Sequence, residues 1–258
     1  MKAYSVISEN KMKFKYFILT LLLSGLCVGA LFAQTSTTKH RILLDLAHKQ
    51  VFWKDTTSIS RMDANQAKRI IYLISELKKT AFSVNAELSF ITEKIKPELL
   101  ANGDLLFIHI PSTKYSSEEV SAITGFLDKG GSMFIVMDED HWSTLKQTNV
   151  NEILKPFGLE YGTKSQDTLV GGHSKAGIIT DKALKITYDN GRVIQGGTPF
   201  CFNQTEQYPF GTYMILPKGG RIIVMGDGMS SLYMTSWKGV NDYQCEEFMH
   251  DAFKWLLK

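Results

Sequence analysis

Short apolar runs that alternate with amphipathic segments constrain the fold of this 258-residue chain more than any other feature. The runs are rich in branched residues, as buried strands are. They read ILLDL (42–46), ELSFIT (87–92), LLFIHI (105–110), MFIVM (133–137) and RIIVM (221–225). Strands that alternate with helices predict a mostly parallel sheet with helices on both faces, which is a flavodoxin-like or Rossmann-like α/β fold.

The segments between these runs carry helix signals. Apolar residues recur at helical spacing over 66–79, and Asp63 is an N-cap candidate for this helix. Ser116 and Glu119 stand at capping-box positions before another apolar stripe. Residues 243–257 predict a final amphipathic helix.

The composition of the sequence changes after Gly158. Residues 159–217 are rich in glycine and in short strand-like runs. Asp189-Asn190-Gly191 predicts a hairpin between LKITY (184–188) and RVIQ (192–195). We interpret this region as a β-rich insertion within one domain that extends over residues 34–258.

The first 33 residues have the composition of an export signal. Lysines at 11, 13 and 15 precede an uncharged apolar run over 17–33 that ends in small residues. This pattern predicts a signal peptide cleaved near Ala33 and a bacterial protein that is periplasmic or secreted, with no stable membrane span after cleavage. An uncleaved anchor is the alternative, because the run is at the short limit for crossing a bilayer.

The charge balance of the remaining chain excludes one class of partner. The formal charge of +3 arises in the first 33 residues, which hold four lysines and one acidic residue, so the rest of the chain is neutral. A nucleic-acid-binding protein needs a surplus of positive charge, and we predict no nucleic-acid partner. Cys201 and Cys245 also lie in this part, either as a disulfide or as two free buried thiols.

The order of the segments resembles a known family. The stretches LLDLAHKQ, DLLFIHIPSTKYSSEEVSAITGFLDKGGSMFIVMDED, NEILKPFGLEYG and GGRIIVMGDGMSS resemble the class I glutamine amidotransferase-like superfamily. The similar branch is the one shared by gliding-motility/ABC-transport auxiliary proteins and an intraflagellar-transport subunit. The resemblance covers roughly residues 40–258 and implies the same wound α/β fold.

The chain departs from the enzymes of that superfamily at the nucleophile. Those enzymes carry a Cys on a strained strand-to-helix turn, backed by a His. Neither Cys201 nor Cys245 follows a strong strand within a Gly-x-Cys-x-Gly turn. The resemblance therefore implies a non-catalytic branch without amidotransferase activity.

The carboxyl ends of the predicted strands carry the candidate catalytic residues, because ligands bind there in open α/β sheets. These candidates are Asp45, His48, Asp138 and His141. An Asp can orient a His as a base, and carboxylates beside a His could bind a divalent cation, although we predict no metal site and no cofactor. Alternatively, Asp45 caps a loop, His48 is a surface residue, and the acidic loop is merely solvated.

The same ends carry candidate ligand-binding residues, namely Ser112, Tyr115, Glu139, Trp142, Asp227 and Trp237. With Trp53, the aromatic members would offer faces for stacking on sugar rings if the loops converge, and would otherwise pack in the core. His109 is expected to be a hydrogen-bonded core histidine. His173 is either a turn residue or a partner of Asp138.

Three functional hypotheses follow. The first is an exported accessory or binding domain of a cell-envelope or glycan-utilisation system, with a small molecule, a glycan or a protein as its partner. The second is a secreted hydrolase that acts on a saccharide or an ester through the Asp/His site. The third is a structural subunit that presents its sheet edge or its β-rich insertion to another protein.

Overall fold

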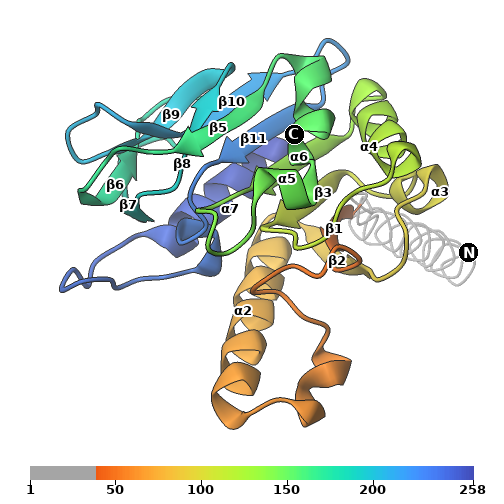
Figure 1. Cartoon of the computed structure of the whole chain (residues 1–258), viewed down its shortest axis with the longest axis horizontal. Helices are drawn as coiled ribbons and strands as arrows, with labels where there is room; N and C mark the ends of the chain where they lie inside the picture. Colours follow the sequence, from red (N-terminus) through yellow and green to blue (C-terminus); the bar gives the residue numbers. More distant parts are fainter. Residues whose placement is uncertain (1–38) are drawn as a thin grey trace, which may run out of the picture. The chain divides into compact units, whose positions relative to one another are not determined.

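A computed structural model describes residues 39–258 of the chain (Figure 1). The predicted signal peptide lies outside the described residues. Within the described range, no helix combines the length and the apolar character that crossing a membrane requires.

The centre of the fold is a nine-stranded sheet with the order β2-β1-β3-β4-β11-β10-β9-β6-β7. Its first five strands are parallel. They are β2 (Ala86–Ile91), β1 (His40–Asp45), β3 (Leu105–His109), β4 (Ser132–Val136) and β11 (Arg221–Met225). This is the strand order of a flavodoxin-like sheet, and it confirms the predicted parallel α/β core.

The β-rich region extends the same sheet instead of standing apart from it. The strands β10 (Pro209–Ile215), β9 (Thr198–Asn203), β6 (Val170–Ser174) and β7 (Leu184–Asp189) continue it in antiparallel pairs. The other two strands of the region, β5 (Glu160–Lys164) and β8 (Arg192–Gln195), form a separate two-stranded sheet. The predicted insertion is thus mostly one half of the central sheet.

The predicted hairpin at 189–191 is wrong, because β7 pairs with β6 while β8 pairs with β5. Asn190 and Gly191 do adopt positive φ angles of 74° and 81°, as a tight turn requires. However, the Arg192 N–H then donates to the Gly226 carbonyl at 2.7 Å. The turn therefore carries the chain across the end of β11 and into the other sheet.

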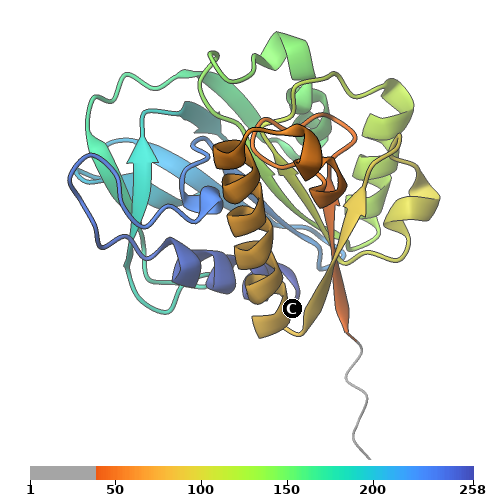
Figure 2. The same cartoon turned by 90° about the horizontal axis from the view of Figure 1, so that it is seen from below.

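Helices cover both faces of the sheet. One face carries α2 (Ala64–Ser83) and α7 (Cys245–Leu256), which lie side by side in Figure 2. The other face carries α3 (Pro97–Leu100), α4 (Ser117–Asp128) and α6 (Val150–Leu154). The shorter helices are η1 (Thr56–Arg61), α5 (Leu145–Thr148), η2 (Lys155–Phe157) and η3 (Ser230–Leu232).

Alternate residues of each central strand enter two separate hydrophobic cores. In β1, Ile42 and Leu44 join the core beneath α2 and α7, whereas Leu43 joins the core beneath α3, α4 and α6. This alternation follows from the two-residue repeat of a strand. It also explains why the strands read as continuous apolar runs, since both faces are buried.

The predicted helix caps are confirmed. The Asp63 side chain accepts hydrogen bonds from the backbone N–H groups of Asn65 and Gln66. Ser116 and Glu119 form a complete capping box at the start of α4. Cys201 and Cys245 are free and buried, and burial raises the pKa of both thiols. Of the two alternatives left by the sequence, the structure thus has two free thiols.

Candidate functional site

The loops after β1, β3 and β4 converge at the carboxyl edge of the parallel strands. The Ser112 N–H donates to the His48 carbonyl at 2.9 Å, and the Ser143 hydroxyl donates to the Pro111 carbonyl at 2.5 Å. The rings of Phe52 and Trp142 meet with centroids 4.7 Å apart. These contacts bring the segments at 45–52, 111–115 and 138–143 together on one rim of the sheet.

The first polar cluster on this rim is centred on His48. Its Nδ1 lies 2.9 Å from Asp45 Oδ2, and its Nε2 lies 3.4 Å from Glu119 Oε1. Its ring stacks on Tyr115 with centroids 3.7 Å apart. The Tyr115 hydroxyl donates to Asp45 Oδ2 at 2.7 Å. We name these four residues, Asp45, His48, Tyr115 and Glu119, the histidine cluster.

The histidine cluster is closed to solvent. Asp45 is fully buried, and His48 and Glu119 are only 4% and 5% exposed. Burial and the Asp45 charge raise the pKa of Tyr115 well above its ordinary value. Burial also acts to raise the pKa of Glu119, but hydrogen bonds from the backbone N–H groups of Ser116 and Ile95, together with His48, leave it lowered. Both ring nitrogens of His48 already face carboxylates, so neither is free for a substrate.

The second cluster pairs two buried carboxylates, Asp138 and Asp227. Asp138 accepts hydrogen bonds from the backbone N–H groups of Glu139 at 2.7 Å and Gly228 at 3.0 Å. Asp227 accepts from Met229 at 2.8 Å and Asp189 at 3.0 Å. Burial raises the pKa of both carboxyl groups, and the Asp138 charge raises that of Asp227 further. Because all four oxygens accept backbone N–H groups, this carboxylate pair anchors the loops after β4, β7 and β11.

His109 is a core residue, as expected. It is fully buried, and its Nε2 lies 3.4 Å from the Gly228 carbonyl. The rings of Phe52, Trp53 and Phe107 surround it. Desolvation in this apolar setting lowers the pKa of His109 to about 4, so the imidazole is neutral at physiological pH.

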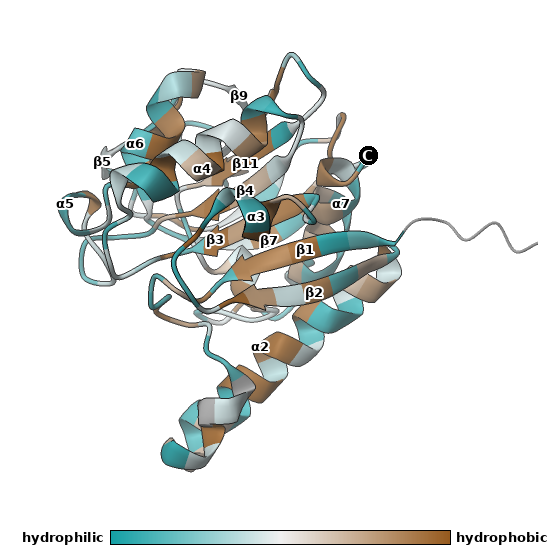
Figure 3. Ribbon diagram, turned by 90° about the vertical axis from the view of Figure 1, so that its right-hand side faces the viewer, coloured by the Kyte–Doolittle hydropathy of each residue, from teal (hydrophilic) through white to brown (hydrophobic). Residues whose placement is uncertain are grey.

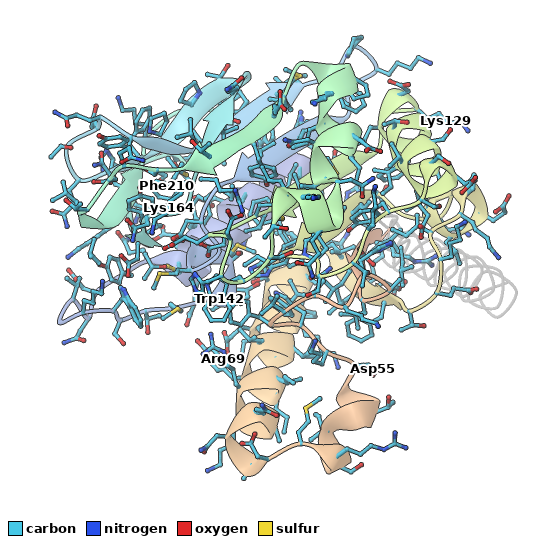
Figure 4. The ribbon with its side chains drawn as sticks, viewed as in Figure 1. Asp55, Arg69, Lys129, Trp142, Lys164 and Phe210 are labelled. Atoms are coloured by element: carbon cyan, nitrogen blue, oxygen red, sulfur yellow. The ribbon has the colours of Figure 1, made fainter. Side chains whose placement is uncertain are left out.

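The aromatic candidates divide into buried and accessible groups. Trp53 and Tyr115 are each 1% exposed and cannot stack on a ligand. Trp142 is 41% exposed and lies on the same rim as Arg69 (Figure 4), whose guanidinium lies 5.3 Å from the Phe52 ring. Trp237 is half-buried and donates from its indole N–H to Asp189 at 3.0 Å.

The rim does not combine all the candidates into one site. Within residues 39–258, no hydrogen bond or ion pair joins the histidine cluster to the carboxylate pair. His141 is exposed and lies 3.8 Å from Glu139, which itself binds Lys164. His173 bonds with Glu206 at 3.2 Å, away from Asp138.

The described part of the chain also lacks a group of three or more His, Cys, Asp or Glu residues arranged to hold a metal ion. Sequence reasoning missed two buried members of the rim. Glu119 was identified only as a helix cap, although its Oε1 also faces His48. Arg192 is 3% exposed and donates from Nε to the Asp138 carbonyl, and its Nη2 bonds Asp140. No local signal marks Arg192, because Asp138 and Asp140 lie 54 and 52 residues away in the sequence.

One sequence family matches the chain. The family described as the IFT52 GIFT domain matches residues 62–173, which is less than half of the chain. No curated protein matches it by sequence.

Solved structures share the fold at low sequence identity. The N-terminal domain of mmIFT52 is 18% identical, with a TM-score of 0.56, over 84% of this chain and 96% of that one. A ThuA-like protein from Parabacteroides merdae is 10% identical, with a TM-score of 0.50, over 85% and 90% of the two chains. An exo-β-1,4-mannosidase from an Opitutaceae bacterium is 11% identical, with a TM-score of 0.50, over 84% of this chain and 35% of its own. At these identities the likeness concerns the fold alone.

These matches correct one prediction and support the coarser part of another. The predicted periplasmic or secreted location is contradicted, because the family that matches residues 62–173 is a domain of an intraflagellar transport protein, and such proteins work in cilia. The apolar leader that motivated the prediction lies outside the described residues. The resemblance to the branch that includes an intraflagellar-transport subunit is supported, while the wider amidotransferase-like assignment stays a prediction.

Proposed function

We infer that the domain is a non-catalytic accessory module that acts through contacts with other proteins. The burial of the histidine cluster supports this most strongly. Its Asp/His pair has the separation of a catalytic dyad, but Glu119 occupies the second ring nitrogen and Tyr115 covers the ring face. A general base must reach the proton that it abstracts, and His48 is 4% exposed.

The family match points in the same direction. IFT52 GIFT is the description of the family that matches residues 62–173, and the N-terminal domain of mmIFT52 has the same fold over most of both chains. A role as an accessory domain of a protein assembly fits a module whose strand ends are closed by their own side chains.

Glycan binding stays a weaker prediction. It requires aromatic faces, and of the four aromatic residues considered only Trp142 and Trp237 retain accessible surface. The carboxylate pair is not accessible to a sugar, since Asp138 and Asp227 are only 6% and 1% exposed.

A paired assay tests the proposed function. The wild-type chain and Asp45→Asn would be incubated with chromogenic esters and glycosides, and the wild type would be melted with sugars, Mg²⁺, Ca²⁺ and Zn²⁺. We expect no turnover and no shift in melting temperature. The assay is sensitive enough to show binding, because a ligand present at 100 times its Kd would stabilise the native state by about 2.7 kcal/mol. Wild-type turnover that is lost in Asp45→Asn at a temperature where the variant is still folded would establish a hydrolase and overturn the proposal.

A further inference from the structure

The two edge strands of the nine-stranded sheet differ in whether their outward backbone groups have hydrogen-bond partners. At the β7 edge, the Gln244 N–H donates to the Lys185 carbonyl at 2.7 Å, and the Lys185 N–H donates to Gln244 Oε1 at 3.2 Å. The Asp189 N–H donates to Asp227 Oδ2 at 3.0 Å. These bonds occupy outward-facing groups of β7, so that edge is closed to another strand.

The β2 edge is open. β2 pairs with β1 alone, and Figure 3 shows these two strands with β2 at the outside. The carbonyls of Asn85 and Ile91 accept from β1 and its extension, at 3.0 Å from His40 and 2.8 Å from Leu46. Parallel ladder bonds recur at every second residue. The intervening residues therefore turn their backbone N–H and C=O groups outward, namely Ala86, Leu88 and Phe90.

The open edge lacks the usual protection against pairing. The sequence of β2, AELSFI, contains no Pro and no Lys, which are the residues that commonly block an edge strand. Within residues 39–258, the outward backbone groups of β2 have no partner from another element. Such a row of unpaired groups is a template for an added strand.

Helix α2 adds an apolar flank on the same side. Its flank toward α7 is occupied, because Tyr72 donates to the Tyr233 carbonyl at 3.0 Å and Ser83 bonds His250 at 2.7 Å. Ile71 and Phe82 each precede a residue of that flank by one position, so they lie about 100° around the helix from it. They are 53% and 84% exposed, and Phe82 stands four residues before the start of β2. The open edge and the apolar flank form one surface, which we name the β2 face.

We propose that the β2 face binds a second copy of this chain through antiparallel β2–β2 pairing centred on Leu88. In this register the outward residues of the two strands oppose one another. Leu88 meets the second copy's Leu88, and the small Ala86 meets the large Phe90 of the other copy. The side chains of Ala86, Leu88 and Phe90 are on the α2 side of the sheet, so the two α2 flanks adjoin across the pair.

The charges on the other side of β2 are compatible with this pairing. Glu87 lies opposite Ser89 of the second copy, so no like charge stands directly across from it. Glu87 is also neutralised within its own chain by Lys39 at 3.4 Å and Arg41 at 3.7 Å. A pairing that opposes small to large and avoids facing like charges is self-complementary, as the interface of a two-fold dimer must be.

The test combines molar mass with cysteine cross-linking of the full chain. Sedimentation equilibrium should give twice the 29.1 kDa of one chain, and Phe82→Glu should weaken the association at least tenfold. Phe82 is 84% exposed, so its replacement leaves the fold of one copy intact. Ile215→Glu, which replaces a residue 56% exposed on β10, is the matched control and should leave the association unchanged.

Cross-linking tests the register. A hydrogen-bonded antiparallel pair has Cα atoms about 5.5 Å apart, which suits a disulfide, so Leu88→Cys should form a covalent dimer on mild oxidation. Ser89→Cys should not form this covalent dimer, because the two Ser89 residues of the pair are diagonal neighbours, roughly 7–8 Å apart.

A monomer at every concentration overturns the proposal, and so does a dimer that Ser89→Cys cross-links while Leu88→Cys does not. A monomer that takes up an extended foreign peptide along β2 also overturns it. None of these results bears on catalysis, so the proposed accessory function would be judged separately.

Discussion

Replacing Asp45 by Asn tests the structural role of the histidine cluster. The Asp45 carboxylate is fully buried and accepts from His48 Nδ1 at 2.9 Å and from the Tyr115 hydroxyl at 2.7 Å. A hydrogen bond to a charged group contributes about 1.5–3 kcal/mol, so weakening both bonds would cost about 3–6 kcal/mol. Because Asn keeps one acceptor oxygen, we expect the lower end, a loss of about 3 kcal/mol in the free energy of unfolding.

Urea unfolding monitored by tryptophan fluorescence measures this loss, with the buried Trp53 as a core reporter. In a domain of this size, about 3 kcal/mol lowers the melting temperature by roughly 6–12 °C. Asp242→Asn is the control, since Asp242 forms an exposed pair with Lys185 and its replacement should be neutral. A loss below about 1 kcal/mol for Asp45→Asn, or a gain in stability as catalytic residues often give when removed, would refute the reasoning.

Three further outcomes follow from buried groups and one tight turn. The folded-state pKa of His109, about 4, lies below its unfolded value of about 6.5. The neutral His109 therefore stabilises the fold fully above about pH 6.5, and about 3 kcal/mol of stability is lost as the pH falls from 7 to 4. His109→Gln should remove this part of the pH profile in urea titrations, and an unchanged profile would contradict it. Burial raises the pKa of Asp227, so its contribution is full below about pH 3.9 and declines as the pH rises through the raised value. Asp227→Asn should flatten that decline above pH 4, and an equally steep decline in the variant would argue against it. Gly191→Ala should cost more than about 1 kcal/mol, because φ is +81° and a Cβ would lie 2.4 Å from the Gly226 carbonyl. Gly177→Ala, where a Cβ meets open space, should be close to neutral, and equal effects of the two would count against the close approach.

The sequence predicts the parallel half of the sheet well because its signals are local. The run over 105–110 is both apolar and branched, and β3 (Leu105–His109) ends within one residue of the prediction. The helix expected over 66–79 extends in fact over Ala64–Ser83. Its first turn is exposed and carries little apolar pattern, so only the cap at Asp63 marks the true start. At the other end, Thr80 and Ala81 are buried and continue the core-facing side beyond residue 79.

The antiparallel half was less predictable because strand pairing is a tertiary property. Asn190-Gly191 has the conformation of a hairpin turn, yet the partners of the flanking strands are β6 and β5. The choice depends on the Arg192–Gly226 contact across β11, which no window of neighbouring residues contains.

The candidate site shows the same division. The rule that the carboxyl ends of parallel strands converge predicts that the loops at 45–48, 111–115 and 138–142 lie together, and in the structure they do. The closure of the site could not be predicted, since it depends on Glu119 entering from the first turn of α4 to face His48 at 3.4 Å. The same contact turns a pair that resembles a catalytic dyad into part of a closed network.

Amide hydrogen exchange of the strand-end loops tests most directly whether this rim is fixed structure or an open site. The amides of Ser112 and Tyr115 donate to the His48 carbonyl and to Asn149 Oδ1, both at 2.9 Å. If the loops are locked, both amides should exchange only through global unfolding, with the same free energy as the β3 and β4 amides. Exchange of these two amides by local opening, several kcal/mol below the global value, would contradict the account.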